Sequence, residues 1–163
     1  MTLTFNQLDQ SLKDAIGNCP DHFNELLELM QLLLITGIRP NEALLHDRWI
    51  YYSDALITLQ PLKGNNIRQF RSIDLPPQFV NSIQTNYKYF QEYNYSMFRR
   101  QFERVYSFPN AYIKNKQSGL YLFRHRYIKD LHQQGKSIAE IKSITGHVSD
   151  GAIYEYIFSD IVV

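Results

Sequence analysis

The chain has 163 residues with a formal net charge of +1, and 44% of its residues are hydrophobic and 14% aromatic. This length fits one domain with a hydrophobic core, and this composition excludes an intrinsically disordered chain. The single cysteine, Cys19, excludes an internal disulfide, and the first ten residues lack the basic-then-apolar pattern of a secretory signal. We therefore expect a single cytoplasmic domain over residues 1–163.

Helical signals open the chain. Thr4 and Gln7 form a capping box that predicts a first helix through about Ile16. Asp21 can cap a second helix, in which apolar residues recur at helical spacing until Gly37 provides a C-terminal cap. Its apolar stretch is too short and too interrupted to cross a bilayer, so we expect a buried helix and no membrane partner.

The residues after this helix restrict the backbone of Arg39. Pro40 suits the first turn of a short third helix. Arg39 then lies at a sharp junction between two helices, with its backbone held from both sides. Its side chain can therefore be aimed at a ligand.

The pattern changes to extended structure between Trp49 and Leu75. Small polar residues and glycine mark two turns within this stretch. The sequence therefore predicts a small antiparallel sheet of three strands. The strands are expected at residues 49–52, 55–59 and 68–75, with turns at 53–54 and 64–66.

The rest of the chain is predicted to be mainly helical, with an exposed loop at residues 108–119. Ser137 with Glu140 forms a second capping box, and Ser149 or Asp150 can cap a final helix. The expected fold class is mixed α+β, mostly helical with the small three-stranded antiparallel sheet. These later helices are expected at residues 78–89, 96–106 and 119–133, then from the Ser137 cap to before Gly146, and finally from Ser149 or Asp150 in a helix that carries Tyr156.

Basic residues cluster locally although the net charge is only +1. Such a balance is a weak argument for DNA binding, because phosphate recognition usually produces a clear basic excess. A solvated helix face is the alternative explanation for each cluster. The clusters comprise Lys63, Arg68 and Arg71; Arg99, Arg100 and Arg104; and Arg124, His125, Arg126 and Lys129.

Four short motifs carry the chemistry: TGIRPNE at residues 36–42, FRH at 123–125, TGH at 145–147, and Tyr156 nine residues after the histidine. Arginine offers a planar donor fork for phosphate oxygens, and a tyrosine hydroxyl can attack phosphorus once the developing charge is stabilised. Each residue alone has a plainer explanation. Arg39 could be a surface cation, His147 could cap a helix end, and Tyr156 could match by chance because the chain has 12 tyrosines. Their joint order is what points to a site.

In this order and spacing the motifs, together with Lys63 in KGN at 63–65, resemble the catalytic domain of tyrosine recombinases, the phage-integrase family. The likeness covers roughly residues 3–158. It implies that Arg39 and Arg124 bind the scissile phosphate, that His147 donates a further hydrogen bond there, and that Lys63 protonates the departing 5′ oxygen. Tyr156 would be the nucleophile and form a 3′-phosphotyrosine, with no metal and no cofactor.

Two features depart from the family pattern. The family has a histidine three residues before the second arginine, where this chain has Tyr121. A tyrosine hydroxyl can still donate to phosphate, but with a pKa of about 10 it is a poorer acid or base at neutral pH. Telomere resolvases, which look like relatives, tolerate the same substitution. Family members also carry an N-terminal DNA-clamp domain, which we expect to be absent from this chain.

The expected function is therefore DNA strand cleavage and rejoining in site-specific recombination or integration, in a mobile element or phage of a prokaryotic or virus-infected cell. The partners would be double-stranded DNA and other protomers, as a dimer or tetramer in a synaptic complex. The alternatives are a DNA-binding or architectural module that lost the chemistry, a telomere resolvase, or a type IB topoisomerase. The domain alone is expected to bind duplex weakly, with strong salt dependence.

Two expectations concern the C-terminal end. Tyr154 and Tyr156 differ by about 200° around a helix, so only one can face the arginines, and we expect Tyr154 to pack inward. Residues 158–163 end in three apolar side chains. We expect them to dock on a neighbouring protomer, with packing in cis on the same domain as the alternative.

Overall fold

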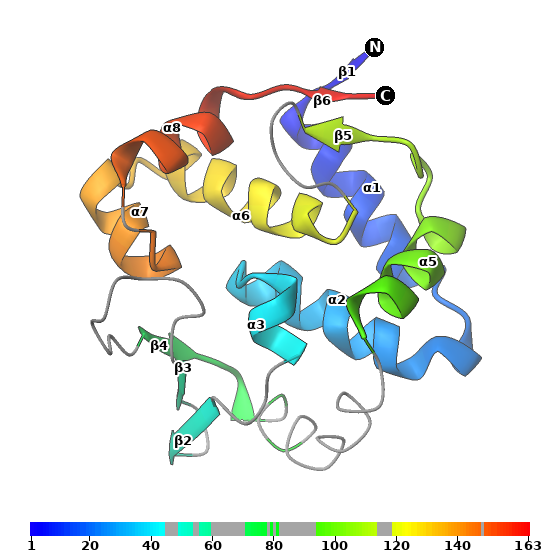
Figure 1. The fold of residues 1–163 in the computed structure, drawn as a ribbon, viewed down its shortest axis with the longest axis horizontal. Coiled ribbons are helices and arrows are strands. Elements are labelled where there is room, and N and C mark those ends of the chain that lie inside the picture. Colours follow the sequence, from blue (N-terminus) through cyan, green and yellow to red (C-terminus); the bar gives the residue numbers. More distant parts are fainter. Residues whose placement is uncertain are drawn as a thin grey trace.

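The computed structural model describes residues 1–44, 49–53, 56–59, 71–77, 79, 81, 94–113, 119–147 and 149–163. Most of these residues are helical, and two small antiparallel sheets lie apart on the fold (Figure 1). The predicted fold class is confirmed. The elements are β1 (Thr2–Leu3), α1 (Phe5–Gly17), a 3₁₀ turn η1 (Asp21–Phe23), α2 (Asn24–Thr36), α3 (Pro40–Leu44), β2 (Trp49–Ser53), β3 (Leu56–Leu59), β4 (Arg71–Asp74), α5 (Tyr95–Val105), β5 (Tyr112–Ile113), α6 (Tyr121–Gln133), α7 (Ile138–Thr145), α8 (Asp150–Phe158) and β6 (Ile161–Val162).

The helix caps follow the sequence closely. Both capping boxes form, with the Thr4 hydroxyl accepting from the Gln7 amide and the Ser137 hydroxyl from the Glu140 amide. Ser149 caps α8 by accepting from the amide of Ala152. These signals are local in sequence, which is why they could be recognised without the fold.

The predicted cap at Asp21 is wrong. The residue lies inside the 3₁₀ turn η1, and α2 begins only at Asn24 without a side-chain cap. Pro20 occupies the extended position before the turn, with φ −66° and ψ 151°. The carboxylate therefore sits in the first turn, where the positive end of the turn still favours an acid.

The predicted three-stranded sheet is present as β2-β3-β4, antiparallel throughout. Trp49 pairs with Leu59, and Leu59 pairs in turn with Arg71. The predicted turn at 64–66 and most of the predicted helix at 78–89 lie outside the described residues. The next predicted helix is α5, whose N-terminus is capped by the side chain of Asn94.

A second sheet, β1-β6-β5, was not predicted. The expected exposed loop at 108–119 is partly wrong, because it contains β5 and because Ala111 and Ile113 are buried. Strands of two residues are too short to show a periodic pattern. Their pairing joins the two ends of the chain, with Thr2 and Tyr112 both opposite Val162.

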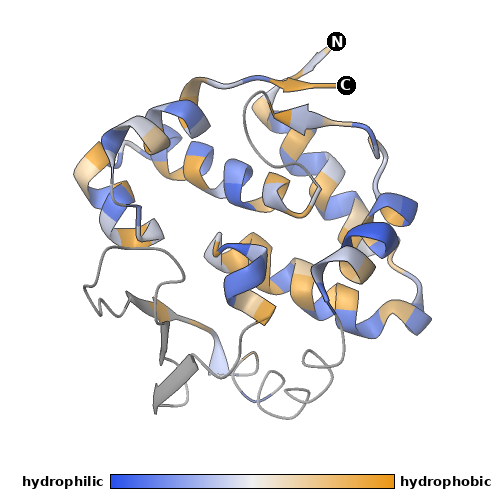
Figure 2. Ribbon diagram, viewed as in Figure 1, coloured by the Kyte–Doolittle hydropathy of each residue, from blue (hydrophilic) through white to orange (hydrophobic). Residues whose placement is uncertain are grey.

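The C-terminal segment packs in cis. Residues Ile161–Val162 form the central strand of the second sheet, and the side chain of Ile161 is buried. Figure 2 shows this end of the chain in the hydrophobic colour, and Figure 1 places it beside the N-terminus. In the single chain the cis alternative holds for Ile161, whereas Phe158 stays 70% exposed, and docking of residues 158–163 on a neighbouring protomer stays a prediction.

Helix α6 connects two hydrophobic clusters. Leu122 and Phe123 belong to a larger cluster built on α1, α2 and α5, whereas Ile128 and Leu131 belong to a smaller one with α7 and α8. The polar residue Arg124 lies on α6 between these two sets. Within the described ranges, none of the helices has the length and apolar character needed to cross a membrane.

Candidate active site

The first arginine is held at the junction of α2 and α3. Gly37 ends α2 in the left-handed conformation with φ 61°, and a Cβ built on it would clash with the ring of Tyr127, so only glycine fits. Glu42 is buried, and its Oε1 accepts from the backbone amide of Arg39 at 3.1 Å and from its guanidinium at 3.2 Å. This double contact aims the Arg39 side chain, which keeps a fifth of its surface exposed (20%).

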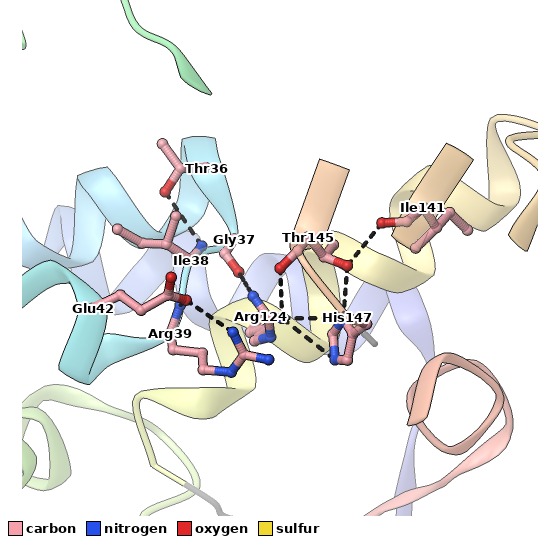
Figure 3. Close-up of polar contacts among 9 residues, drawn as sticks. All are labelled: Thr36, Gly37, Ile38, Arg39, Glu42, Arg124, Ile141, Thr145 and His147. Carbon is pink, nitrogen blue, oxygen red and sulfur yellow. Dashed lines mark hydrogen bonds and ion pairs between the residues drawn. The ribbon is translucent and has the colours of Figure 1, made fainter. Parts of the chain in front are cut away.

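The second arginine, Arg124, is fully buried on α6. Its Nη1 donates to the carbonyl of Gly37 at 2.8 Å and its Nη2 to the carbonyl of Thr145 at 3.0 Å (Figure 3). These carbonyls lie at the C-terminal ends of α2 and α7, where the helix dipoles are negative. Two helix ends therefore stabilise one buried cation, which would otherwise be costly to remove from water.

Helix α7 delivers the histidine. Gly146 ends this helix with φ 74°, so that His147 turns back toward α6. Nη2 of Arg124 lies 3.1 Å from Nδ1 and 3.3 Å from Nε2 of His147. The hydroxyl of Thr145 lies 2.6 Å from Nδ1. The TGH motif thus contacts Arg124 through both a carbonyl and a ring.

Tyr156 on α8 faces this cluster. Its side chain is buried, and its ring packs edge-on against His147 and His125 at centroid distances of 5.4 and 5.8 Å. The guanidinium carbon of Arg124 lies 6.0 Å from the ring centroid. Of the two tyrosines on α8, the one expected to face the arginines does so.

The expectation that Tyr154 packs inward is wrong. It is 46% exposed and stacks on Phe158 with nearly parallel rings. Helix α8 covers the smaller cluster with one face only, so a residue on its opposite face has no core to enter.

Tyr121 begins α6 and is largely buried beside Tyr95, with the two rings edge to face at 6.0 Å. Burial and the nearby Tyr156 raise its pKa, and the charges of Arg39 and Arg124 oppose that rise only in part. The Tyr121 hydroxyl is therefore neutral, and it interacts electrostatically with both arginines and with Tyr156, the candidate nucleophile. Burial also raises the pKa of Tyr95, to about 12.

Of the six residues predicted for the site, the structure brings Arg39, Tyr121, Arg124, His147 and Tyr156 together. Lys63 lies outside the described residues.

Two contributors were missed from the sequence. Thr145 bonds to the histidine, and Lys129 donates from Nζ to the carbonyl of Ile157 at 3.0 Å, which anchors the end of the helix that carries Tyr156. Burial lowers the pKa of Lys129, and Asp160 opposes this shift. Helical spacing places Lys129 on α6, but no local signal shows that α8 ends against it.

Solved structures share this fold. The XerH site-specific recombinase bound to its difH substrate in a pre-cleavage complex matches with a TM-score of 0.65 at 17% identity, over 95% of this chain and 49% of its own. The XerA recombinase matches with 0.65 at 15%, over 97% and 60%. The Tn1549 transposon integrase in complex with a circular intermediate DNA matches with 0.63 at 16%, over 96% and 60%.

The chain thus spans about half to three fifths of the length of these proteins. Comparison with protein-family models and with curated proteins found no match. At these identities the likeness concerns the fold. The chain has the fold of tyrosine recombinase catalytic domains, the family that its motifs resemble.

Proposed function

We propose that this domain cleaves and rejoins DNA through Tyr156. The single observation that carries the proposal is the convergence of a buried arginine, a histidine and a buried tyrosine: the Arg124 guanidinium lies against both His147 and the Tyr156 ring. An arginine fork binds phosphate oxygens, and a neighbouring hydroxyl can then attack phosphorus.

The proposed reaction assigns one role to each group. Arg39 and Arg124 hold the nonbridging oxygens of the scissile phosphate and stabilise the charge of the pentacoordinate transition state. His147 adds a hydrogen bond to the same phosphate. The Tyr156 hydroxyl loses its proton to solvent as its oxygen bonds to phosphorus, the bond to the 5′ oxygen breaks, and Lys63 gives the leaving oxygen its proton.

The product is a 3′-phosphotyrosine with a free 5′ hydroxyl on the other strand end. Attack by a 5′ hydroxyl reverses the step and releases Tyr156, so rejoining needs no nucleotide cofactor. We propose double-stranded DNA as the substrate and other protomers, in a dimer or tetramer, as the partners. Site-specific recombination or integration in a mobile element or phage, in a prokaryotic or virus-infected cell, is the proposed setting.

A second candidate is a DNA-binding module of the same fold without chemistry. It is favoured by Tyr121, which stands where the family has histidine, and by the net charge of only +1. A telomere resolvase shares the first steps and the tyrosine at this position, and differs in which ends it rejoins.

The test is a nicked suicide substrate, which loses a short fragment after cleavage and traps the covalent complex. We expect the chain to form an adduct that resists denaturant, Tyr156→Phe to form none, and Tyr154→Phe, on the exposed face of the same helix, to react as the parent does. Failure of the parent to form an adduct while it still binds duplex would favour the non-catalytic module.

A further inference from the structure

The side chain of Thr145 joins the end of α7 to the ring of His147. It is almost fully buried (2% exposed), and its Oγ1 lies 2.7 Å from the carbonyl oxygen of Ile141 and 2.6 Å from Nδ1 of His147 (Figure 3). Thr36 at the end of α2 makes the same bond to the carbonyl four residues earlier, at 2.7 Å, but its Oγ1 accepts from the backbone amide of Ile38 at 3.4 Å where that of Thr145 meets an imidazole. Helices α2 and α7 therefore both end on a threonine that bonds to the carbonyl four residues earlier, and only the threonine of α7 is known to contact an imidazole as well.

The hydroxyl of Thr145 must donate its proton to the carbonyl oxygen of Ile141. A carbonyl oxygen only accepts, so two oxygens 2.7 Å apart require the hydroxyl proton between them, on the line to Ile141. Toward His147 the same Oγ1 must then act as the acceptor. At 2.6 Å this requires a proton on Nδ1.

Arg124 is compatible with this tautomer but does not select it. A guanidinium only donates, and its Nη2 lies 3.1 Å from Nδ1 and 3.3 Å from Nε2, so these distances favour neither nitrogen as the acceptor. Once Thr145 requires a proton on Nδ1, only Nε2 of the neutral ring can accept from Arg124. The threonine therefore sets the tautomer, with the proton on Nδ1 and the lone pair on Nε2.

We propose that Thr145 is a positioning residue that fixes His147 as the Nδ1–H tautomer, so that Nε2 is the nitrogen presented to the site. The use of Nε2 rests on the proposed function. When a phosphate binds and the ring takes up a proton, Nδ1–H keeps its bond to Thr145 and the new Nε2–H donates to a phosphate oxygen. The Thr145 hydroxyl oxygen thus accepts from Nδ1–H in both the neutral and the protonated His147 ring, and the ring does not need to flip.

The first measurement reads the tautomer directly and requires no activity. Nitrogen-edited NMR of the imidazole in the full chain, assigned through His147→Gln, should show a protonated Nδ1 and an unprotonated Nε2 in the parent. Thr145→Ser keeps the hydroxyl and should give the same spectrum. Thr145→Val keeps the branched shape without the acceptor and should shift the ring toward the Nε2–H form or a mixture.

Thr36→Val is the matched control, because it removes the same bond at the other helix end and should leave the His147 spectrum unchanged. Adduct formation gives the second readout. We expect Thr145→Val to slow cleavage by roughly 10- to 100-fold, the loss typical when the outer partner of a metal-ligating histidine is removed, and Thr145→Ser to restore most of the rate.

An Nε2–H ring in the parent, or an unchanged tautomer in folded Thr145→Val, would overturn the inference. If Thr145→Val does not fold, the spectrum of the parent still decides. A parent that shows the expected tautomer but forms no adduct supports the role of Thr145 and rejects the proposed function, so the two failures are distinguishable.

Discussion

The two hydrophobic clusters differ in what they carry. The larger one, on α1, α2 and α5, includes buried residues from both ends of the described chain, such as Leu3 and Ile161. The smaller one packs α7 and α8 against the second half of α6, and it contains Tyr156 itself. Arg39 lies just after α2, a helix of the larger cluster, and His147 lies just after α7, a helix of the smaller cluster. Arg124 lies on α6 between the two clusters.

This difference separates Arg39, a proposed phosphate ligand, from Tyr156, the proposed nucleophile. The junction that aims Arg39 is built into the more extensive core, whereas Tyr156 and His147 depend on a few side chains and on the anchor from Lys129. The two parts are joined through Arg124, which bonds to the ends of α2 and α7 at once. A change on the smaller side should therefore affect chemistry before it affects the rest of the fold.

Replacing Arg124 should have the largest effect, because it removes the side chain that joins the end of α2 to the end of α7. Arg124→Met removes the donor to the carbonyls of Gly37 and Thr145, at a cost of about 1–3 kcal/mol each, and removes a proposed phosphate ligand. We expect a loss of several kcal/mol in unfolding free energy and no detectable adduct. Urea unfolding and the suicide substrate measure the two effects.

Arg126→Met is the control for that change. It removes an arginine from the same helix, but this arginine bonds to Asp9 on α1 and not to the site. A variant of Arg124 that stays as stable and as reactive as the Arg126 variant would contradict the role of Arg124 as the joint.

A pair of cavity variants compares the clusters directly. Ile153 in the smaller cluster and Leu29 in the larger are both fully buried, so either alanine variant should lose about 2–5 kcal/mol. Under conditions where both variants stay folded, Ile153→Ala should slow adduct formation more, because Ile153 lies on the helix that carries Tyr156. Equal rates for the two variants would mean that the smaller cluster does not hold the proposed nucleophile, Tyr156, in place.

Tyr121 tests the polar edge of the site. Tyr121→Phe removes one neutral donor from an anion site and should slow cleavage by about 10- to 1000-fold with little change in DNA affinity, because the bond matters most in the transition state. Tyr121→His restores the family's usual residue. If the Phe variant cleaves as fast as the parent, the tyrosine is a core side chain packed against Tyr95 and its hydroxyl has no role.

The parts of the fold that the sequence predicted are those with local causes. The boxes at Thr4 and Ser137 and the helix stop at Gly37 each need only a few neighbouring residues. The order of the motifs also predicted which side chains meet. The second sheet escaped prediction because its strands are two residues long and pair Thr2 with Val162, across nearly the whole chain.

The missed parts of the site have two origins. The bond between the Thr145 hydroxyl and His147 spans only two residues, but it depends on the backbone turn at Gly146 that ends α7. The anchor from Lys129 depends on where α8 ends against α6, which spacing does not show. The inward placement of Tyr154 failed for a related reason, since only the packed structure shows that α8 has a core on one side alone.

The smallest expected effect concerns the link between α1 and α6 on the larger side of the molecule. Asp9 accepts from Arg126 at 2.8 Å and from Lys13 at 2.8 Å. Burial alone would raise the pKa of Asp9, but these hydrogen bonds and charges outweigh it and lower the pKa below its ordinary value of 3.8. A carboxyl with a lowered folded pKa stabilises the fold above its unfolded pKa, and that contribution is lost as the pH falls through the folded value.

Asp9→Asn should therefore cost about 1 kcal/mol at neutral pH, less at high salt, because the pair is only partly buried. The difference from the parent should shrink toward zero as the pH is lowered below 4, since the parent then loses the same charge. Urea unfolding of both proteins at neutral and acidic pH measures it, with cleavage at neutral pH expected to be unchanged. A difference that grows in acid, or a slower cleavage, would show that the α1–α6 link is coupled to the site and that the two sides of the molecule are not as separate as their packing indicates.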